Sequence, residues 1–105
     1  MGAHRTLDCD LLVIGSGAIG IEFASFYRTL GAEVTVVEMQ DRIMPVEDEE
    51  ISTLARKSFE KQGIKFLLKT TVNKLEHGKN NVTAHFSGAT TDKATYDRVI
   101  VAVGI

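Results

Sequence analysis

One pattern restricts the fold more than any other: two apolar runs flank a glycine-rich turn and a helical segment within residues 11–38. Residues 11–14 are an unbroken run of branched apolar side chains, which is typical of a strand buried on both faces. Residues 18–30 lack proline and precede Gly31, which favours a helix that ends at a glycine. Residues 34–37 form the second apolar run. Strand, helix and strand within about 30 residues predict a parallel crossover unit and therefore an α/β fold.

The rest of the chain predicts one further helix and several short strands. After a loop that holds Pro45, the carboxylate of Asp48 is suited to cap a helix that ends at Gly63. This helix carries an apolar stripe of Ile51, Leu54, Ala55, Ser58 and Phe59. Strands are predicted at residues 64–68, 70–76, 82–86, 94–96 and 99–103. The three middle strands alternate and are separated by turn residues, so we expect them to form an antiparallel meander.

The turn between the first strand and helix reads Gly-x-Gly-x-x-Gly over residues 15–20. In dinucleotide sites, Gly15 would make the tight turn, Gly17 would let a pyrophosphate approach, and Gly20 would let helix and strand pack closely. The helix N-terminus attracts phosphate, and Glu38 lies where such sites place a carboxylate for the ribose hydroxyls. We therefore predict a dinucleotide site in a Rossmann-like three-layer domain with a parallel sheet and a three-stranded antiparallel β-meander. The alternative is a glycine turn without a ligand.

Glu38 also bears on the choice of dinucleotide, because a carboxylate there repels the 2′-phosphate of NADP. Arg42 instead favours NADP, since a nearby arginine can accommodate that phosphate. A solvated loop charge or pairing with Asp41 is the simpler interpretation of Arg42. We therefore expect NAD.

Composition and charge exclude several other classes of function. The 105 residues, 44% apolar and 25% charged, fit one soluble globular domain. The net charge of −2 gives no basic surface for nucleic acid or for an anionic membrane. No apolar segment approaches the roughly 18–20 residues that span a bilayer, and no signal peptide is recognisable, so we expect a cytoplasmic or mitochondrial-matrix location. No metal site or internal disulfide is expected, given the spacing of His4, His77 and His85 and the single Cys9.

Four segments, at residues 15–22, 36–38, 41–45 and 101–104, read GSGAIGIE, VVE, DRIMP and VAVG. In type and spacing they resemble the NAD-binding domain of the dihydrolipoamide dehydrogenases, which are FAD-dependent pyridine nucleotide-disulfide oxidoreductases. The resemblance implies that residues 11–105 are such a domain, inserted in the family between two segments of a FAD-binding domain and followed by a dimerisation domain. Residues 1–10 are expected to be a leader segment.

The resemblance also assigns site residues. The cofactor-binding set is Gly15, Ser16, Gly17, Ala18, Ile19, Gly20, Ile21, Glu22, Glu38, Val72 and Gly104. Residues 15–20 would hold the pyrophosphate and Glu38 the adenine ribose. Glu22 would lie near the nicotinamide, with a favourable helix-dipole contact as the alternative. Val72 would pack near the adenosine, with plain strand packing as the alternative. Gly104 would pass beside the nicotinamide, although many relatives have Gly-Arg where this chain has Gly104-Ile105.

For the parent enzyme, the resemblance implies oxidation of dihydrolipoyl groups through a dithiol and FAD, with hydride passed to NAD⁺. Its partners would be a second subunit of a homodimer and the lipoyl-bearing components of 2-oxo acid dehydrogenase complexes. We assign no catalytic residue to this chain, which lacks paired cysteines, and expect it to be inactive alone. The alternatives are a stand-alone nucleotide-sensing module, which the meander opposes, the NAD(P)H domain of another flavoprotein disulfide reductase, and the FAD-binding half of a flavoprotein, which residues 41–45 fit poorly.

Overall fold

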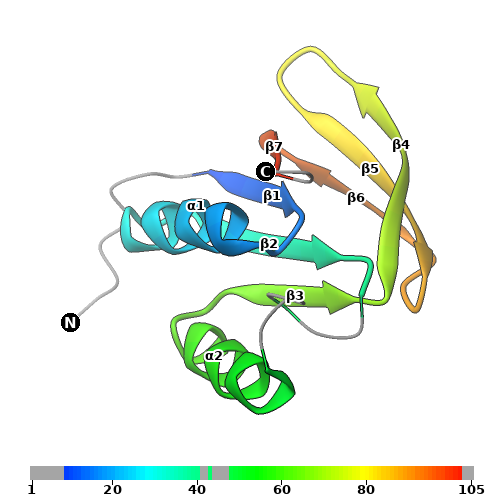
Figure 1. Cartoon of the computed structure of the whole chain (residues 1–105). Helices are drawn as coiled ribbons and strands as arrows, with labels where there is room; N and C mark the ends of the chain where they lie inside the picture. Colours follow the sequence, from blue (N-terminus) through cyan, green and yellow to red (C-terminus); the bar gives the residue numbers. More distant parts are fainter. Residues whose placement is uncertain (1–8, 41–42, 44–47, 103–105) are drawn as a thin grey trace.

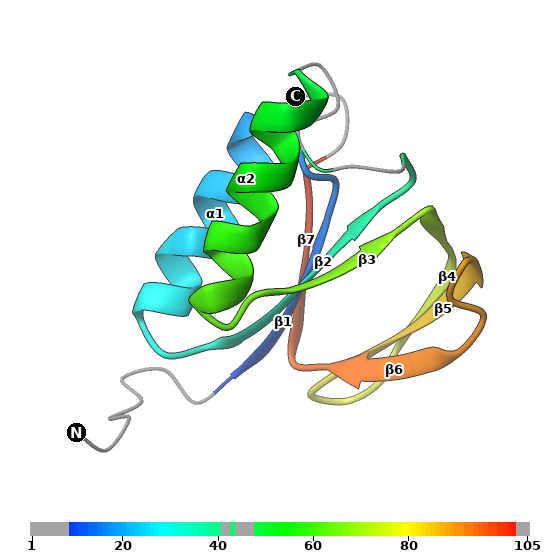
Figure 2. The same ribbon diagram turned by 90° about the horizontal axis from the view of Figure 1, so that it is seen from below.

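In the described part of the chain the fold has three layers: two helices, a four-stranded parallel sheet and a three-stranded antiparallel sheet (Figures 1 and 2). The computed structural model describes residues 9–40, 43 and 48–102. In chain order the elements are β1 (Asp10–Ile14), α1 (Ala18–Thr29), β2 (Glu33–Glu38), α2 (Glu49–Lys61), β3 (Lys65–Leu68), β4 (Thr70–His77), β5 (Val82–Gly88), β6 (Lys93–Tyr96) and β7 (Arg98–Val101). The predicted order of elements and the Rossmann-like architecture are confirmed. The predicted last strand extends to residue 103, which lies outside the described residues.

β1 is a central strand of the parallel sheet, whose order is β3-β2-β1-β7. Leu12 of β1 pairs with Thr35 of β2 on one side and with Val99 of β7 on the other, in parallel in both cases. Because β2 and β3 extend to one side of β1 and β7 lies on the other, the strand order reverses beside β1. Open α/β sheets bind their ligands at the carboxyl ends of strands near such a reversal. The topology therefore directs attention to the turn that follows β1.

Both faces of the parallel sheet are covered, which explains why β1 is almost wholly apolar. The face toward the helices has a core of Leu11, Val13, Ala24, Ala32, Val34, Val36, Ile64 and Ala102. The face toward the antiparallel sheet has a second core of Leu12, Val37, Ala84 and Phe86. Successive residues of β1 thus enter opposite cores, as the period of a strand requires. The antiparallel sheet occupies the face that a doubly wound sheet would cover with further helices.

The antiparallel sheet, ordered β4-β5-β6, contains a β-bulge between Val72 and Lys74. An extra residue in one strand shifts the alternation of side chains between the two faces. As a result Val72 and Leu75, three residues apart, both pack against the second core. The bulge therefore keeps β4 attached to the parallel sheet on both sides of the irregularity.

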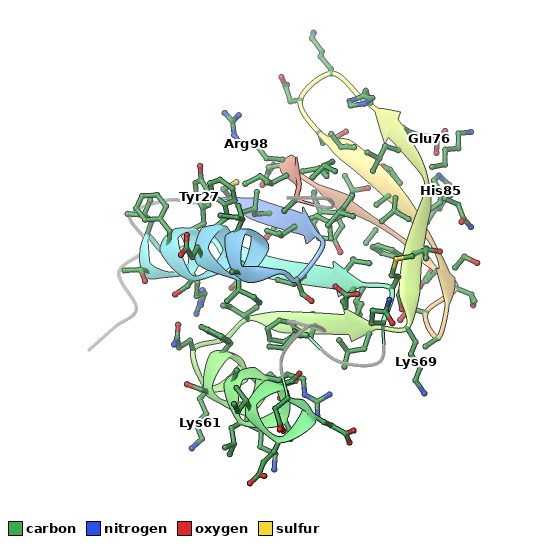
Figure 3. The ribbon with its side chains drawn as sticks, in the orientation of Figure 1. Tyr27, Lys61, Lys69, Glu76, His85 and Arg98 are labelled. Atoms are coloured by element: carbon green, nitrogen blue, oxygen red, sulfur yellow. The ribbon has the colours of Figure 1, made fainter. Side chains whose placement is uncertain are left out.

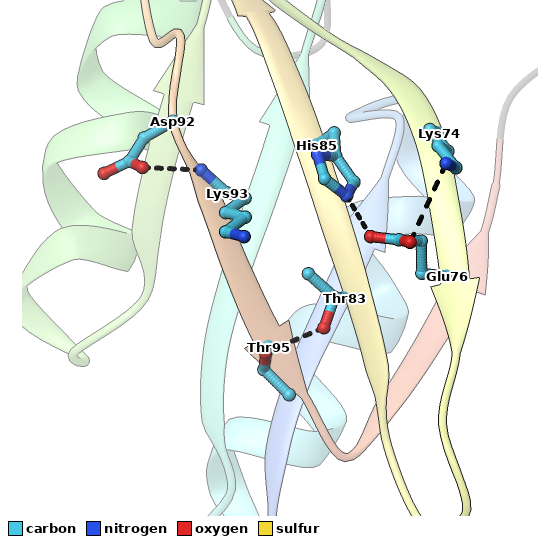
Figure 4. Close-up of polar contacts among 7 residues, drawn as sticks. All are labelled: Lys74, Glu76, Thr83, His85, Asp92, Lys93 and Thr95. Atoms are coloured by element: carbon cyan, nitrogen blue, oxygen red, sulfur yellow. Dashed lines mark hydrogen bonds and ion pairs between the residues drawn. The ribbon is translucent and has the colours of Figure 1, made fainter.

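Polar pairs cover the outer face of the antiparallel sheet. Glu76 contacts His85 and Lys74, and the hydroxyls of Thr83 and Thr95 hydrogen-bond to each other across β5 and β6 (Figure 4). The hydrogen bond from His85, followed by the charge of Lys74, lowers the pKa of Glu76. Glu76 and His85 lie on the outer side of the molecule (Figure 3), so these contacts identify the solvent face of this sheet.

Helix α1 packs very close to the turn that follows β1. Gly15 has a φ of 104°, a left-handed conformation that favours glycine. A Cβ added to Gly20 would lie well inside van der Waals contact of the Gly15 carbonyl oxygen and would also touch Ala102. The backbone conformation therefore favours glycine at position 15, and the packing requires it at position 20.

Helix α2 begins as predicted, because the carboxylate of Asp48 accepts a hydrogen bond from the Glu50 amide at 2.8 Å. The predicted apolar stripe, however, is only partly correct: Ile51 and Leu54 are 53% and 62% exposed. Ser52 faces inward instead, and its hydroxyl donates to the Ile43 carbonyl oxygen at 2.5 Å. This hydrogen bond joins the first part of α2 to Ile43. Within the described part of the chain, no helix is long and apolar enough to cross a bilayer.

We expect Gly20→Ala to lower the free energy of unfolding by about 2 kcal/mol, because the new methyl group forces α1 away from the β1 turn. Gly17→Ala is the matched control, since a Cβ there meets no atom within 4 Å. It should change stability by less than about 0.5 kcal/mol. Urea unfolding followed by circular dichroism measures both. Equal losses in the two variants would show that the close contact is not what requires Gly20.

Candidate dinucleotide-binding site

A cleft of about 470 Å³ opens at the carboxyl ends of β1 and β2, beside β4. Its volume is within the range of small-molecule sites. It is lined by Ile14, Gly15, Val37, Glu38, Met39, Thr70, Thr71, Val72, Asn73, Lys74 and Leu75. The cleft thus brings together three predicted site residues from separate parts of the chain: Gly15, Glu38 and Val72.

The glycine turn is held on both sides by backbone hydrogen bonds. The Gly15 amide donates to the Val37 carbonyl oxygen, and the Ala102 amide donates to the Ile14 carbonyl oxygen, each at 2.8 Å. Gly17 differs from Gly20, because a Cβ at Gly17 would meet only open space. Its φ of −65° suits any residue, so neither packing nor backbone conformation requires glycine at this position. The close approach of a ligand would require it.

The two helices differ in whether side chains cap the backbone amides and balance the dipole at the N-terminus. Asp48 caps α2, and Glu49 and Glu50 place negative charge in its first turn. Helix α1 has no side-chain cap at Gly17 and no acidic residue in its first turn. The amides and the positive end of the dipole of α1 are therefore left for an anion from outside the helix.

Glu38 is the buried acid of the site, with only 5% of its surface exposed. Ser16 donates two hydrogen bonds to Oε1 of Glu38, from its amide at 3.1 Å and from its hydroxyl at 2.6 Å. The Gln40 amide donates to Oε2 at 2.8 Å. These donors offset the desolvation of a carboxylate and fix it beside the turn, at the predicted position.

β4 contributes more to the cleft than the sequence indicated. Val72 lies in the lining, as predicted, but Thr71, Asn73 and Lys74 lie there with it. Consecutive residues of a regular strand point to opposite faces, and the bulge interrupts this alternation within the segment that lines the cleft. Two apolar residues three apart in an alternating strand, Val72 and Leu75, were the signal that could have revealed it.

The remaining predicted residues lie away from this cleft or outside the described residues. Ile21 is buried in the protein, Glu22 is exposed on α1, and neither lines the cleft. Ala18 and Ile19 lie in the first turn of α1, also outside the lining. Gly104 and Arg42, for which roles were also predicted, lie outside the described part of the chain.

A second, larger cleft of about 570 Å³ lies at the amino-terminal end of the parallel strands. Its lining mixes charges of both signs, including Asp10, Lys65, Asp92 and Lys93. Burial raises the pKa of Tyr96 there, an effect that a hydrogen bond with Thr35 opposes. Because α/β sheets bind ligands at the opposite end, we place the candidate site in the smaller cleft. No group of metal-ligating side chains occurs among the described residues.

Comparison with known proteins agrees with this geometry. Residues 10–91 match the pyridine nucleotide-disulphide oxidoreductase family. A dihydrolipoyl dehydrogenase of Rhizobium etli is 54% identical over 98 residues, which cover 91% of this chain and 20% of that protein. The chain thus spans about a fifth of this relative.

Two solved structures share the fold. A pyridine nucleotide-disulfide family oxidoreductase from Enterococcus faecalis is 29% identical with a TM-score of 0.82, over 91% of this chain and 22% of that one. An NAD-dependent persulfide reductase from A. fulgidus is 34% identical with a TM-score of 0.82, over 90% of this chain and 17% of that one. On its sequence and its fold, the chain belongs to the pyridine nucleotide-disulphide oxidoreductase family.

Proposed function

We propose that this chain is the NAD(H)-binding domain of a FAD-dependent dihydrolipoamide dehydrogenase. One observation carries the proposal: a buried, fixed carboxylate, Glu38, lies in a cleft directly beside a glycine turn and an uncapped helix N-terminus. Ribose hydroxyls need an acceptor, which Glu38 offers, and a pyrophosphate needs amides and positive potential, which the start of α1 offers.

The residues present fit a dinucleotide. The open space in front of Gly17 gives the pyrophosphate access to the amides of residues 17–20. Glu38 accepts hydrogen bonds from the adenine ribose, and the half-buried Val72 and the exposed Met39 offer apolar contact for adenine. When bound, the nicotinamide supplies a site for hydride transfer, and this chain binds and orients the cofactor for it.

The choice of NAD over NADP rests on the charge of Glu38. A 2′-phosphate would bring negative charge against a carboxylate that its three hydrogen bonds hold in place. The persulfide reductase that shares the fold is named as NAD-dependent, which supports the same choice.

The parent reaction we propose is dihydrolipoyl oxidation through a dithiol and FAD, with NAD⁺ as the final acceptor. Support comes from the 54% identity to a dihydrolipoyl dehydrogenase, against 34% to the persulfide reductase. The parent would act as a homodimer with lipoyl-bearing partners of 2-oxo acid dehydrogenase complexes. FAD and the dithiol would be held by regions of the parent beyond this chain, whose only cysteine is Cys9.

Calorimetric titration tests the cofactor. We expect the chain to bind NADH at least about tenfold more tightly than NADPH, because of like-charge repulsion at Glu38. Glu38→Ala should weaken NADH binding by roughly ten- to 100-fold, the loss expected for hydrogen bonds to a charged acceptor, and should narrow the preference. Equal or tighter binding of NADPH by the unmodified chain would overturn the assignment to NAD.

Gly17→Val should reduce NADH binding by more than about 100-fold, because the side chain fills the space through which the pyrophosphate reaches the α1 amides. The far-UV circular dichroism should be unchanged, since that space holds no protein atom within 4 Å of the Cβ position. A variant that binds NADH normally would show that the phosphates lie elsewhere.

The chain alone should not oxidise dihydrolipoamide, because one cysteine cannot form the disulfide that accepts two electrons. The measurement is NAD⁺ reduction by flavin-free protein with dihydrolipoamide, against a heat-denatured control. Turnover that disappears in Cys9→Ser would show redox chemistry within this chain.

A further inference from the structure

Ser16 occupies the first variable position of the glycine motif. It does not line the cleft itself, but its side chain bonds to Glu38, which does. Its hydroxyl donates to Oε1 of Glu38 at 2.6 Å, and only 1% of its surface is exposed. We propose that Ser16 is a positioning residue that sets the discrimination between NADH and NADPH by holding the Glu38 carboxylate. This inference rests on the proposed function and adds to it the residue that fixes the specificity-determining charge.

The local backbone explains why Ser16 can do this. The left-handed conformation of Gly15 turns the chain at the end of β1, and the Gly15 amide remains bonded to Val37, the neighbour of Glu38. The amide and hydroxyl of Ser16 then converge on one oxygen, Oε1. Among the described residues, the Ser16 hydroxyl is the side-chain donor that reaches Glu38.

The other carboxylate oxygen is held from the opposite side. Oε2 accepts from the Gln40 amide at 2.8 Å, and the Gln40 carbonyl oxygen accepts from the Lys69 amide at 2.8 Å. An ionised carboxylate has about four acceptor sites, so Oε2 retains capacity for a ribose hydroxyl. The carboxylate is thus fixed by Ser16 on Oε1 while Oε2 stays available to a ligand.

Fixing the carboxylate affects specificity as well as affinity. A charge that cannot turn away presents its acceptor to the ribose hydroxyls and its repulsion to a 2′-phosphate. Without the hydroxyl, the bond that remains to Oε1 from the described residues is the 3.1 Å contact with the Ser16 amide, and the carboxylate can rotate. NADH then loses an oriented acceptor, whereas NADPH loses part of the repulsion. A purely structural serine would alter stability without altering the ratio of the two affinities.

The test is a double-mutant cycle on the 105-residue chain, with NADH and NADPH titrated against the unmodified protein, Ser16→Ala, Glu38→Ala and the double variant. We expect Ser16→Ala to raise the Kd for NADH about tenfold, the order of one hydrogen bond to a charged group. The Kd for NADPH should change less than about twofold, so the preference falls by nearly the same factor. In the Glu38→Ala background, removing the Ser16 hydroxyl should have no further effect, because the hydroxyl acts through that carboxylate.

Ser52→Ala is the matched control, since Ser52 is another 1%-exposed serine whose hydroxyl donates one short hydrogen bond, but to the Ile43 carbonyl. Ser52→Ala should lower thermal stability and leave the ratio of the Kd for NADPH to the Kd for NADH unchanged. Ser16→Cys, with a weaker donor of similar size, should give an intermediate ratio and replaces Ser16→Ala if that variant does not fold.

An unchanged ratio in Ser16→Ala, or in Ser16→Cys where that variant replaces it, would overturn the proposal. An equal loss for NADH and NADPH that persists in the Glu38→Ala background would also overturn it, because it would indicate direct contact with the phosphates. If the unmodified chain binds neither nucleotide, the proposed function itself fails. That result is distinct from either outcome for Ser16.

Discussion

The close approach of α1 to the end of β1 is the contact on which the arrangement of the site depends. Gly20 has no room for a Cβ against the Gly15 carbonyl, so helix and turn are packed at backbone distance. That distance places the uncapped start of α1 beside the carboxyl ends of β1 and β2. The same turn directs Ser16 to Glu38. One packing constraint therefore positions both the groups suited to phosphate and the acid suited to ribose.

The second wall of the cleft comes from a distant part of the chain and depends on different contacts. The chain passes from β3 to β4 at Lys69, which has a positive φ of 53° and whose amide bonds to the Gln40 carbonyl next to the site. Ala84 and Phe86 of β5 complete the core beneath that wall with Leu12 and Val37. An antiparallel sheet covers this face of the parallel sheet, where a doubly wound fold would have helices. Its edge strand β4, which contains the bulge, therefore runs along the cleft.

Much of this could be predicted from the sequence, because the signals were local. The apolar run before Gly15, the glycine spacing and the acid after the second strand each follow from contacts within about 30 residues. The parts that could not be predicted depend on tertiary packing. The apolar pattern of α2 did not indicate that Ile51 and Leu54 are exposed, or that Ser52 is buried and bonded to Ile43. The partnership of Ser16 with Glu38 required coordinates, because a serine at a turn has many available acceptors.

The position of β1 in the sheet has a consequence for how the chain is made. Of the described strands, β1 is synthesised before the others, yet one of its two neighbours, β7, is the last of them. Asp10 and Asp97, which bond to each other at that edge, are 87 residues apart. While the segment between these two strands is synthesised, the edge of the apolar strand β1 that later pairs with β7 has no partner. Such edges pair readily with other chains, and contacts this distant in sequence form slowly. The nascent polypeptide, rather than the finished domain, is therefore the stage at which aggregation competes most strongly with folding and at which chaperones have most to protect.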